Sequence, residues 1–186
     1  MIKPATPELD GVRAGLRPLR PSDRDAVRSL LLEPEVARWW PAGTPGHPEA
    51  EIYEEGDEWP SFAWAIVEPG LDPLIGIMLA TETVEPQYRC VGIDLSLTAR
   101  AHGRGLGPEA IGLAIDWLCS ERGHHRITID PDAGNARAIR AYEKVGFEPV
   151  GVMRAYSTLP TGEHRDALFM ELIRVLEGSP PPSSAA

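Results

Sequence analysis

The sequence predicts one α+β domain, and three observations carry this prediction. The chain has 186 residues, which suits a single domain, and 42% of them are hydrophobic, which is enough to build a core. Runs typical of strands come before, between and after segments with helical spacing. No internal repeat is visible in the sequence. We expect the domain at residues 14–175, between a flexible N-terminus at 1–13 and a disordered Pro- and Ser-rich tail at 176–186.

The first half of the expected domain consists mainly of strands. A helix is expected at residues 22–40, where apolar residues recur at helical spacing and Ser22 suits the N-cap position. A short acidic helix or loop is expected at residues 48–59. Apolar or alternating runs bounded by turn residues predict the strands of this half. These strands are expected at residues 15–21, 61–67, 74–83 and 89–98.

The second half begins with the clearest helix of the chain, at residues 107–123. Its apolar residues stand at positions i, i+3, i+4 and i+7, and Gly123 suits its end. A second helix has Asn135, a favoured N-cap residue, at its start. The remaining expected elements are a strand at 126–130, the helix at 135–147 and a hairpin of strands 149–157 and 166–173.

The composition argues against several classes of partner. A formal net charge of −10 and a pI of about 5.0 disfavour nucleic acid, whose phosphates need a basic surface, and are compatible with a cationic partner. No apolar run approaches the roughly 20 residues that span a bilayer, and residues 1–11 lack the apolar core of a secretory signal. We therefore expect no membrane partner and a cytoplasmic protein. Cys90 and Cys119 are too few for a disulfide framework or a zinc site, so we expect both in the core and no metal.

A glycine-rich loop carries the chemistry. Gly103, Gly105 and Gly107 follow a predicted strand and lead into the helix at 107–123. Without Cβ atoms their backbone N–H groups can converge on one point, and the helix N-terminus adds unpaired N–H groups and its positive dipole end. The pattern therefore predicts a site for a pyrophosphate. The Gly-Lys-Ser/Thr ending of a nucleotide P-loop and the glycine spacing of a dinucleotide fingerprint are both missing.

Two motifs together resemble the GNAT N-acetyltransferase superfamily. Arg100-x-x-Gly103-x-Gly105 matches its acyl-CoA signature, and residues 135–147 match its Asn-x-x-Ala-x-x-x-Tyr-x-x-x-Gly-Phe helix. The resemblance covers roughly residues 14–174. It implies the GNAT acyl-CoA N-acyltransferase fold, in which a twisted mixed sheet with splayed central strands is flanked by helices. It also implies acetyl-CoA (coenzyme A) as the cofactor that supplies the acetyl group.

The resemblance further implies how the cofactor is held. Its pantetheine arm would lie between the splayed strands, and backbone groups of the glycine-rich loop would hold its phosphates. Asn135 would contact the arm. Tyr142 would point its hydroxyl at the sulfur, either as a general acid or only to orient the cofactor. The expected cofactor-binding residues are Leu95, Leu97, Arg100, His102, Gly103, Arg104, Gly105, Leu106, Gly107, Asn135, Ala138 and Tyr142.

Asp94 is the candidate base for an acceptor amine. Strand alternation puts it on one face with Ser96 and Thr98, opposite Leu95 and Leu97. An acid within an otherwise apolar strand is costly unless it has a partner or a function. A protonated amine must lose a proton before it attacks a thioester directly, and a carboxylate can take that proton. We therefore expect Asp94 to be catalytic, with a structural, hydrogen-bonded acid as the alternative.

Three further phrases are similar to those of the aminoglycoside 6′-N-acetyltransferases. They are "GIDLSL…GRGLG", "ITIDPDAGNARAIRAYEKVGFEPVG" and the early "EVARWW". The resemblance implies an aminoglycoside acceptor, with Asp94 and Asp130 as substrate carboxylates and Trp39 or Trp40 as an apolar wall for a sugar ring. An acetyltransferase of this kind would confer antibiotic resistance. The protein is expected to act as a monomer or homodimer.

Charge gives a separate argument for a cationic acceptor. Residues 48–59 hold six acids and no base, which suits either an acidic lip at the entrance or a solvated helix face. Glu82 and Glu85 are further candidates for substrate binding. The segment after residue 150 looks more like the branch that acetylates ribosomal proteins and other amines. The alternatives are therefore a protein N-terminal or small-amine acetyltransferase, and a non-enzymatic acyl-CoA-binding module.

Overall fold

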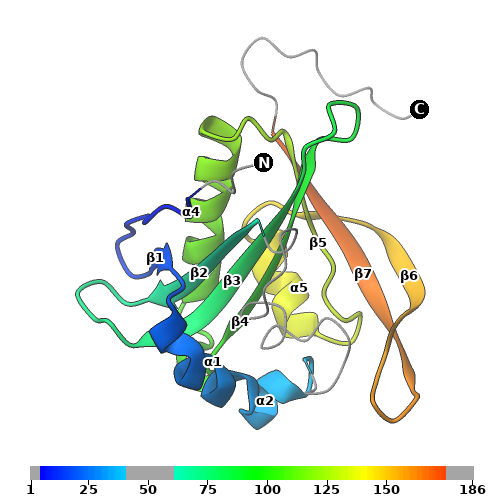
Figure 1. Cartoon of the computed structure of the whole chain (residues 1–186). Coiled ribbons are helices and arrows are strands. Elements are labelled where there is room, and N and C mark those ends of the chain that lie inside the picture. The colour runs from blue at the N-terminus through cyan, green and yellow to red at the C-terminus, as the bar shows by residue number, and fades with distance from the viewer. Residues whose placement is uncertain (1–4, 41–60, 175–186) are drawn as a thin grey trace.

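The computed structural model describes residues 5–40 and 61–174, and a single twisted sheet forms its centre (Figure 1). The strands lie in the order β1-β2-β3-β4-β5-β7-β6. Neighbouring strands run antiparallel except β4 and β5, which run parallel. The predicted α+β class and the mixed sheet are confirmed. The strands are β1 (Gly15–Pro18), β2 (Phe62–Val67), β3 (Leu74–Thr83), β4 (Cys90–Leu97), β5 (Arg126–Ile129), β6 (Glu148–Thr158) and β7 (His164–Ile173).

Helices cover both faces of this sheet (Figure 1). α4 (Leu106–Ser120) and α5 (Ala136–Glu143) pack into the larger apolar core on one face. α1 (Arg24–Leu31) and α2 (Pro34–Ala37) contribute to a smaller core on the other face. Both cores follow from the helical spacing, because an apolar stripe on each helix can bury itself only against the sheet. No helix in the described part of the chain is both long and apolar enough to cross a membrane.

The strands β4 and β5 separate soon after they meet. Their pairing consists of Val91 with Ile127 and Gly92 with Thr128. From Asp94 to Leu97, β4 continues beside β3, while β5 ends at Ile129 and pairs with β7 on its other side. The two central strands therefore splay apart, as the resemblance implied, and their facing edges leave room for a ligand.

The helix expected at 22–40 is two helices in the structure. Pro34 lacks the N–H that would continue α1 and instead occupies the first position of α2, where no N–H is needed. The expected cap at Ser22 is wrong as well, because residues 21–23 form a short 3₁₀ turn before α1 begins at Arg24. The capping residue lies in the expected turn, but it is Asp23 and not Ser22. The Asp23 carboxylate accepts a hydrogen bond from the Arg20 N–H.

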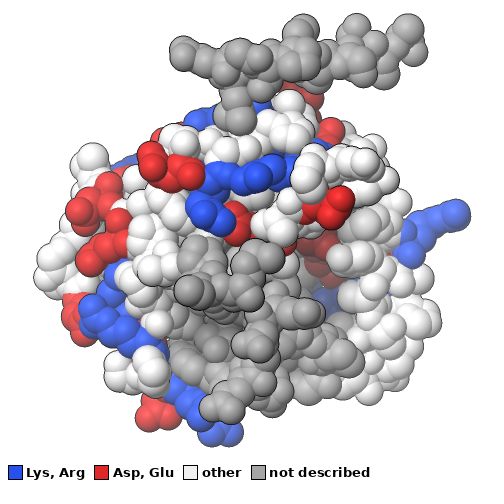
Figure 2. All heavy atoms as spheres, turned by 45° about the horizontal axis from the view of Figure 1, so that its top comes forward, with Lys and Arg blue, Asp and Glu red and all other residues white. Residues whose placement is uncertain are grey.

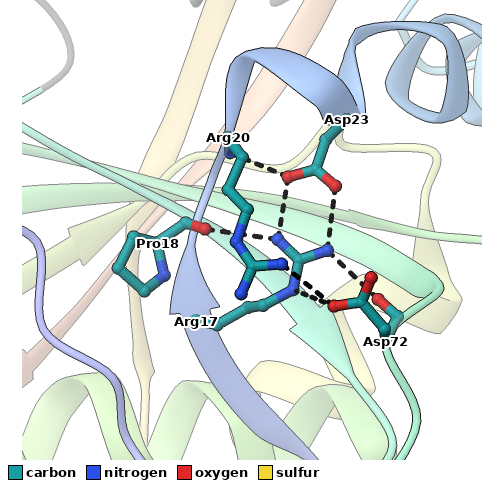
Figure 3. Close-up of polar contacts among 5 residues, drawn as sticks. All are labelled: Arg17, Pro18, Arg20, Asp23 and Asp72. Carbon is teal, nitrogen blue, oxygen red and sulfur yellow. Dashed lines mark hydrogen bonds and ion pairs between the residues drawn. The ribbon is translucent and has the colours of Figure 1, made fainter.

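The Asp23 carboxylate also forms a buried ion pair (Figure 3). Two guanidinium nitrogens of Arg17 donate to the two carboxylate oxygens of Asp23, each at 2.8 Å. Arg17 also donates to the Asp72 carbonyl at 3.1 Å, and Arg20 pairs with the Asp72 carboxylate. The Arg17 hydrogen bond outweighs burial and holds the pKa of Asp23 below its usual value. The bidentate pair ties β1 to the turn at residues 21–23, and the bond to Asp72 ties β1 to the turn that precedes β3.

The segment before β1 also contacts the domain. The backbone of Leu9 pairs with that of Leu16, and the Trp64 indole N–H donates to the Pro7 carbonyl at 2.8 Å. Residues 5–13 thus lie along the sheet beside β1, whereas residues 1–4 and the tail at 176–186 lie outside the described residues. These contacts bring Arg13 next to the glycine-rich loop.

Candidate active site

An open pocket lies where β4 and β5 diverge. It holds roughly 1060 Å³ of empty space and is bounded by β4, the glycine-rich loop, the ends of α2 and β5, and α5. Most of the residues that the sequence singled out meet there. They are Trp39, Trp40, Asp94, Leu95, Leu97, His102, Gly103, Gly105, Leu106, Gly107, Asp130, Asn135, Ala138 and Tyr142.

The glycine-rich loop has the backbone that its sequence predicted. Gly103 and Gly105 have φ angles of 72° and 77°, in the left-handed region that L side chains rarely adopt, and Gly105 is the N-cap of α4. Gly107 is buried, and an added Cβ there would lie 3.1 Å from the Leu97 Cδ1. The first backbone N–H groups of a 15-residue helix therefore open onto a loop in which side chains do not block access. This arrangement fits a pyrophosphate.

Arg13, in the segment before β1, supports the loop. Its backbone N–H and Nε donate to the two carboxylate oxygens of Glu109, at 2.7 and 2.8 Å, and its Nη1 donates to the Arg104 carbonyl at 3.4 Å. A Cβ added to Gly105 would lie 3.1 Å from the same Nη1. Arg104 in turn forms an ion pair with Glu68. These contacts fix the loop from the N-terminal segment and from the turn after β2.

His102 and Arg137 form a pair at the edge of the pocket. The His102 Nε2 lies 3.0 Å from the Leu97 carbonyl, which can only accept, so Nε2 carries the proton. The Arg137 guanidinium donates to the other ring nitrogen at 2.9 Å. Burial and the Arg137 charge lower the pKa of His102, which matches a neutral imidazole. The sequence analysis missed Arg137, although its place two residues after Asn135, on the first turn of α5, was a usable signal.

Asn135 has the structural role that was predicted for it. Its side chain accepts a hydrogen bond from the Ala138 N–H at 3.2 Å and so caps α5. The start of α5 lines the pocket, and Tyr142, about two turns further along the same helix, lines it as well. Tyr142 is buried and packs edge-on against Phe147 at 6.2 Å between ring centroids.

Two carboxylates share the inner end of the pocket with Tyr142. Asp94 lies on β4, and Asp130 follows directly after β5, so they stand on the two strands that splay apart. Burial, with the charges of Asp94 and Asp130, raises the pKa of Tyr142. Burial also raises the pKa of Asp130, against a hydrogen bond from Tyr156. The alternation on β4 is as expected, since Leu95 and Leu97 pack against the larger core, but all residues from Asp94 to Leu97 reach the open strand edge.

The structure puts two predicted site residues, Arg100 and Glu82, away from the pocket. Arg100 is exposed on the 3₁₀ turn after β4 and does not line the pocket. The Arg104 side chain pairs with Glu68, while the contact predicted for Arg104 was through the loop backbone. The prediction for Glu82 is overturned more clearly. Its carboxylate accepts hydrogen bonds from Arg122, at 3.0 Å for each oxygen, and from His124 at 2.7 Å. With its side chain 4% exposed and away from the pocket, Glu82 is structural.

The sequence also predicted buried cysteines and an acidic segment at residues 48–59. Cys119 is buried in the larger core, whereas Cys90 is half-buried at the start of β4. The acidic run at 48–59 lies outside the described residues. On the face drawn in Figure 2, Lys and Arg side chains lie among Asp and Glu side chains over the described surface. Acidic and basic side chains are therefore interspersed on that face.

Comparison with known families identifies the family that shares the glycine-rich loop and the splayed strands. The model of the acetyltransferase (GNAT) domain matches residues 13–148, which include both motifs and the strands between which the pocket opens. The chain belongs to the GNAT acetyltransferase family. A GNAT acetyltransferase takes its acetyl group from acetyl-CoA, and the open loop at the N-terminus of α4 fits the pyrophosphate of that cofactor.

Two curated relatives of this GNAT chain carry names from antibiotic resistance. It is 39% identical over 82 residues to a kanamycin resistance protein of Rhizobium radiobacter, a match that covers 44% of this chain and 70% of the relative. It is 38% identical over 82 residues to aminoglycoside N(6′)-acetyltransferase type 1 of Klebsiella pneumoniae. That match covers 44% of this chain and 38% of the relative, so the chain spans well under half of the second protein.

Solved structures share the fold over most of the chain. The aminoglycoside acetyltransferase AAC(6′)-Ib in complex with coenzyme A has a TM-score of 0.67 and 26% identity, covering 87% of this chain and 95% of the other. RimJ of Mycobacterium smegmatis, in complex with CoA-disulfide, has a TM-score of 0.73 and 19% identity, covering 90% and 88%. The second likeness shows the fold alone, and the GNAT fold predicted from the two motifs is confirmed.

Proposed function

We propose that this GNAT acetyltransferase acetylates the 6′-amine of an aminoglycoside or of a closely related polyamino sugar. One observation carries the proposal: Asp94 on β4 and Asp130 directly after β5 line the same pocket as Tyr142, so an acceptor cation would meet two carboxylates where the thioester is expected. Trp39 and Trp40 line the same pocket and offer apolar surface to a sugar ring. The names of the two curated relatives support the same acceptor class.

The acceptor amine arrives protonated and must first lose its proton. In our proposal Asp94 takes that proton, directly or through a water, and the freed lone pair attacks the acetyl carbonyl. When bound, acetyl-CoA supplies the activated acetyl group as a thioester. The N–C bond forms as the C–S bond breaks, and a backbone N–H from the open edge of β4 at Asp94–Leu95 stabilises the negative charge on the carbonyl oxygen. The Trp wall and the loop mainly supply alignment.

The raised pKa of Tyr142 bears on its role. A free thiol has a pKa of about 8.5, and Tyr142 holds its proton above the usual tyrosine value of 10.0. A complete proton transfer from Tyr142 to the departing thiolate would therefore run uphill. We propose that the Tyr142 hydroxyl donates a hydrogen bond that orients the sulfur and stabilises the thiolate, and that solvent supplies the proton afterwards.

A peptide amine is the second candidate acceptor. β6 is an 11-residue strand at the edge of the sheet, and its residues are exposed along nearly its whole length. An edge strand presents unpaired backbone groups to which an extended peptide can add. This feature favours a protein N-terminus as acceptor, in agreement with the resemblance of the C-terminal hairpin to the branch that acetylates ribosomal proteins.

Release of the CoA thiol distinguishes these acceptors. The full chain is given acetyl-CoA with kanamycin, tobramycin, gentamicin or basic peptides, and the acetylated position is found by NMR. We expect turnover on aminoglycosides with a free 6′-amine and a large loss on a matched analogue with a hydroxyl at that position. Turnover on peptides alone would replace the first acceptor by the second. Binding of CoA without turnover on any amine would favour a non-enzymatic module.

A further inference from the structure

The Arg165 side chain joins three parts of the chain beside the pocket. Arg165 lies near the start of β7. Its Nη1 donates to the Arg38 carbonyl, at the end of α2, at 2.7 Å and to the Asp132 carboxylate, in the loop after β5, at 3.4 Å. Arg165 is not among the described residues that line the pocket, so it can act on a ligand only through these neighbours.

Arg165 holds the end of α2, which carries the two tryptophans of the pocket. α2 has only four residues, and so short a helix depends on contacts with the rest of the fold. The last carbonyl groups of a helix have no partner within it, and Arg165 supplies a charged donor to one of them, the Arg38 carbonyl. The next two residues, Trp39 and Trp40, both line the pocket. The contact therefore helps to fix the part of the chain that bears them.

The two tryptophans differ in how else they are held. Trp40 packs against the smaller core, whereas Trp39 belongs to neither apolar core of the described residues. The Arg38 guanidinium lies over the Trp39 ring, 4.8 Å from its centroid. On the loop after β5, a Cβ added to Gly134 would lie 4.0 Å from the Trp39 Cζ3. The place of Trp39 thus depends on the contact between α2 and that loop.

Asp132 shapes the loop on the other side of this contact. Its Oδ2 pairs with Arg165, and its Oδ1 accepts a hydrogen bond from the Gly134 N–H at 2.8 Å. The Asp132 carbonyl accepts from the Asn135 N–H at 2.8 Å, and Asn135 lines the pocket. One guanidinium nitrogen thus couples the wall of the pocket that comes from α2 to the wall that follows β5.

We propose that Arg165 is a positioning residue that sets acceptor selectivity, because it holds Trp39 against the loop after β5. The inference rests on the proposed function in one respect, since it assumes that a ring of the acceptor lies against Trp39. A rigid ring gains apolar contact with a fixed tryptophan at little cost in conformational freedom, whereas a flexible linear amine gains less. Arg165 therefore favours amines that carry a ring, without contacting the acceptor or acetyl-CoA itself.

The first test needs no acceptor. The full chain is labelled with fluorotryptophan, and the ¹⁹F signal of Trp39 is assigned by its loss in Trp39→Phe. Arg165→Ala should shift or broaden that signal, while the signals of Trp64 and Trp117, which pack together in the larger core, should stay unchanged. Arg165→Lys keeps a charged donor and should restore part of the wild-type signal. An unchanged Trp39 signal in Arg165→Ala would overturn the inference, whatever the acceptor.

Two further variants separate this contact from general folding. Arg174→Ala removes an exposed ion pair with α4, just after β7, and should leave the Trp39 signal unchanged. Gly134→Val perturbs the contact from the loop, because its Cβ would lie 3.1 Å from the Asp132 Oδ1 and 4.0 Å from the Trp39 ring. It should move the Trp39 signal while Arg165 is intact. A Trp39 signal that responds to Arg174→Ala, or that ignores Gly134→Val, would contradict positioning by this contact.

The second test is a double-mutant cycle read out by kinetics. With kanamycin as acceptor, Arg165→Ala should raise the acceptor KM by roughly 3- to 30-fold, with kcat and the KM for acetyl-CoA little changed. In the Trp39→Ala background the same substitution should change the acceptor KM by less than about two-fold, because its effect passes through Trp39. Additive losses would show that Arg165 acts by another route and would overturn the inference.

A linear diamine, tested as an acceptor or as a competing inhibitor, measures the selectivity. Its KM or inhibition constant should change much less in Arg165→Ala than the KM for kanamycin does. Equal losses would contradict a preference for ring-bearing amines. If the wild type acetylates no aminoglycoside while the Trp39 signal still responds to Arg165→Ala, the proposed function fails and the positioning of Trp39 by Arg165 stands.

Discussion

Glu82 and Asp130 are both acids held out of full contact with water, and their surroundings differ sharply. Glu82 meets two basic side chains, Arg122 and His124, within 3.0 Å. Asp130 meets a tyrosine hydroxyl, and among the described residues no basic side chain forms an ion pair with it. Burial raises the pKa of each acid, but at Glu82 the hydrogen bonds from Arg122 and His124, with the Arg122 charge, outweigh it and lower the pKa, whereas at Asp130 the pKa stays raised.

The contrast separates a structural acid from one that can bind a ligand. A buried carboxylate whose two oxygens already accept hydrogen bonds from basic side chains has little capacity left for a substrate. A carboxylate that faces a pocket with only a hydroxyl partner gains from an incoming cation, because that cation supplies the missing charge. Loss of the first acid should therefore lower stability, while loss of the pocket acids should lower activity.

The largest effect is expected from Asp94→Asn. The substitution removes the proposed base and should lower kcat/KM for the acceptor by ~10- to 10⁴-fold, with the KM for acetyl-CoA little changed. Steady-state kinetics with saturating acetyl-CoA measure this. Asp116→Asn, on the exposed side of α4, is the matched control. Activity near that of the wild type in Asp94→Asn would show that Asp94 is not the base and that a pocket acid can be lost without loss of activity.

Gly105→Val tests the cofactor end of the same pocket. A side chain at a φ of 77° is strained, and its Cβ would lie 3.1 Å from the Arg13 guanidinium. The distorted loop should bind the phosphates of the cofactor more weakly, and the KM for acetyl-CoA should rise by roughly 10- to 100-fold. Gly112→Ala, in open space on α4, is the control. Unchanged affinity for acetyl-CoA, measured by calorimetry, would contradict the assignment of the loop.

Glu82→Gln should act on stability alone. The substitution leaves Arg122 and His124 without their carboxylate, and because Arg122 is partly exposed we expect a loss of about 1–3 kcal/mol in the free energy of unfolding. Urea denaturation measures the loss, and the exposed Glu85→Gln is the control. The folded variant should retain its kcat/KM. A stable variant with reduced activity would reverse the comparison and return Glu82 to the active site.

The stabilisation from Glu82 should also depend on pH in one direction. Its pKa is lower in the folded protein than the ordinary 4.5, so its contribution is present above pH 4.5 and is lost as the pH falls through the folded pKa. Glu82→Gln should therefore flatten the acid side of the stability curve. The same steep acid limb in the variant and in the wild type would assign acid lability to other groups.

The smallest change in stability is expected from Asp130→Asn. A folded pKa above the ordinary 3.8 means that ionisation of Asp130 costs stability as the pH rises, so removing the charge should leave the unfolding free energy unchanged or slightly higher at pH 7. The acceptor KM should rise about 10-fold, because a desolvated charge pair with the substrate is lost. A marked fall in thermal stability would make Asp130 a structural acid like Glu82.

Sequence reasoning predicted those parts of the site that lie on one stretch of chain. The glycines of the loop, the Asn135 cap and the alternation around Asp94 each express a local rule of backbone or periodicity. Reasoning failed where a partner comes from far along the chain. Glu82 seemed free to bind a substrate because Arg122 and His124 follow it by 40 and 42 residues.

The sequence alone determined the family, the acetyl donor and the order of strands and helices along the chain. Motifs and hydrophobic periodicity are properties of local sequence and do not depend on the tertiary fold. Tertiary structure decided which acids are neutralised and which remain available to a substrate. It brought Arg13 onto the glycine-rich loop, Arg137 onto His102, and Arg122 and His124 onto Glu82. Charge and desolvation act through space over a few ångströms, and only the folded chain sets those distances.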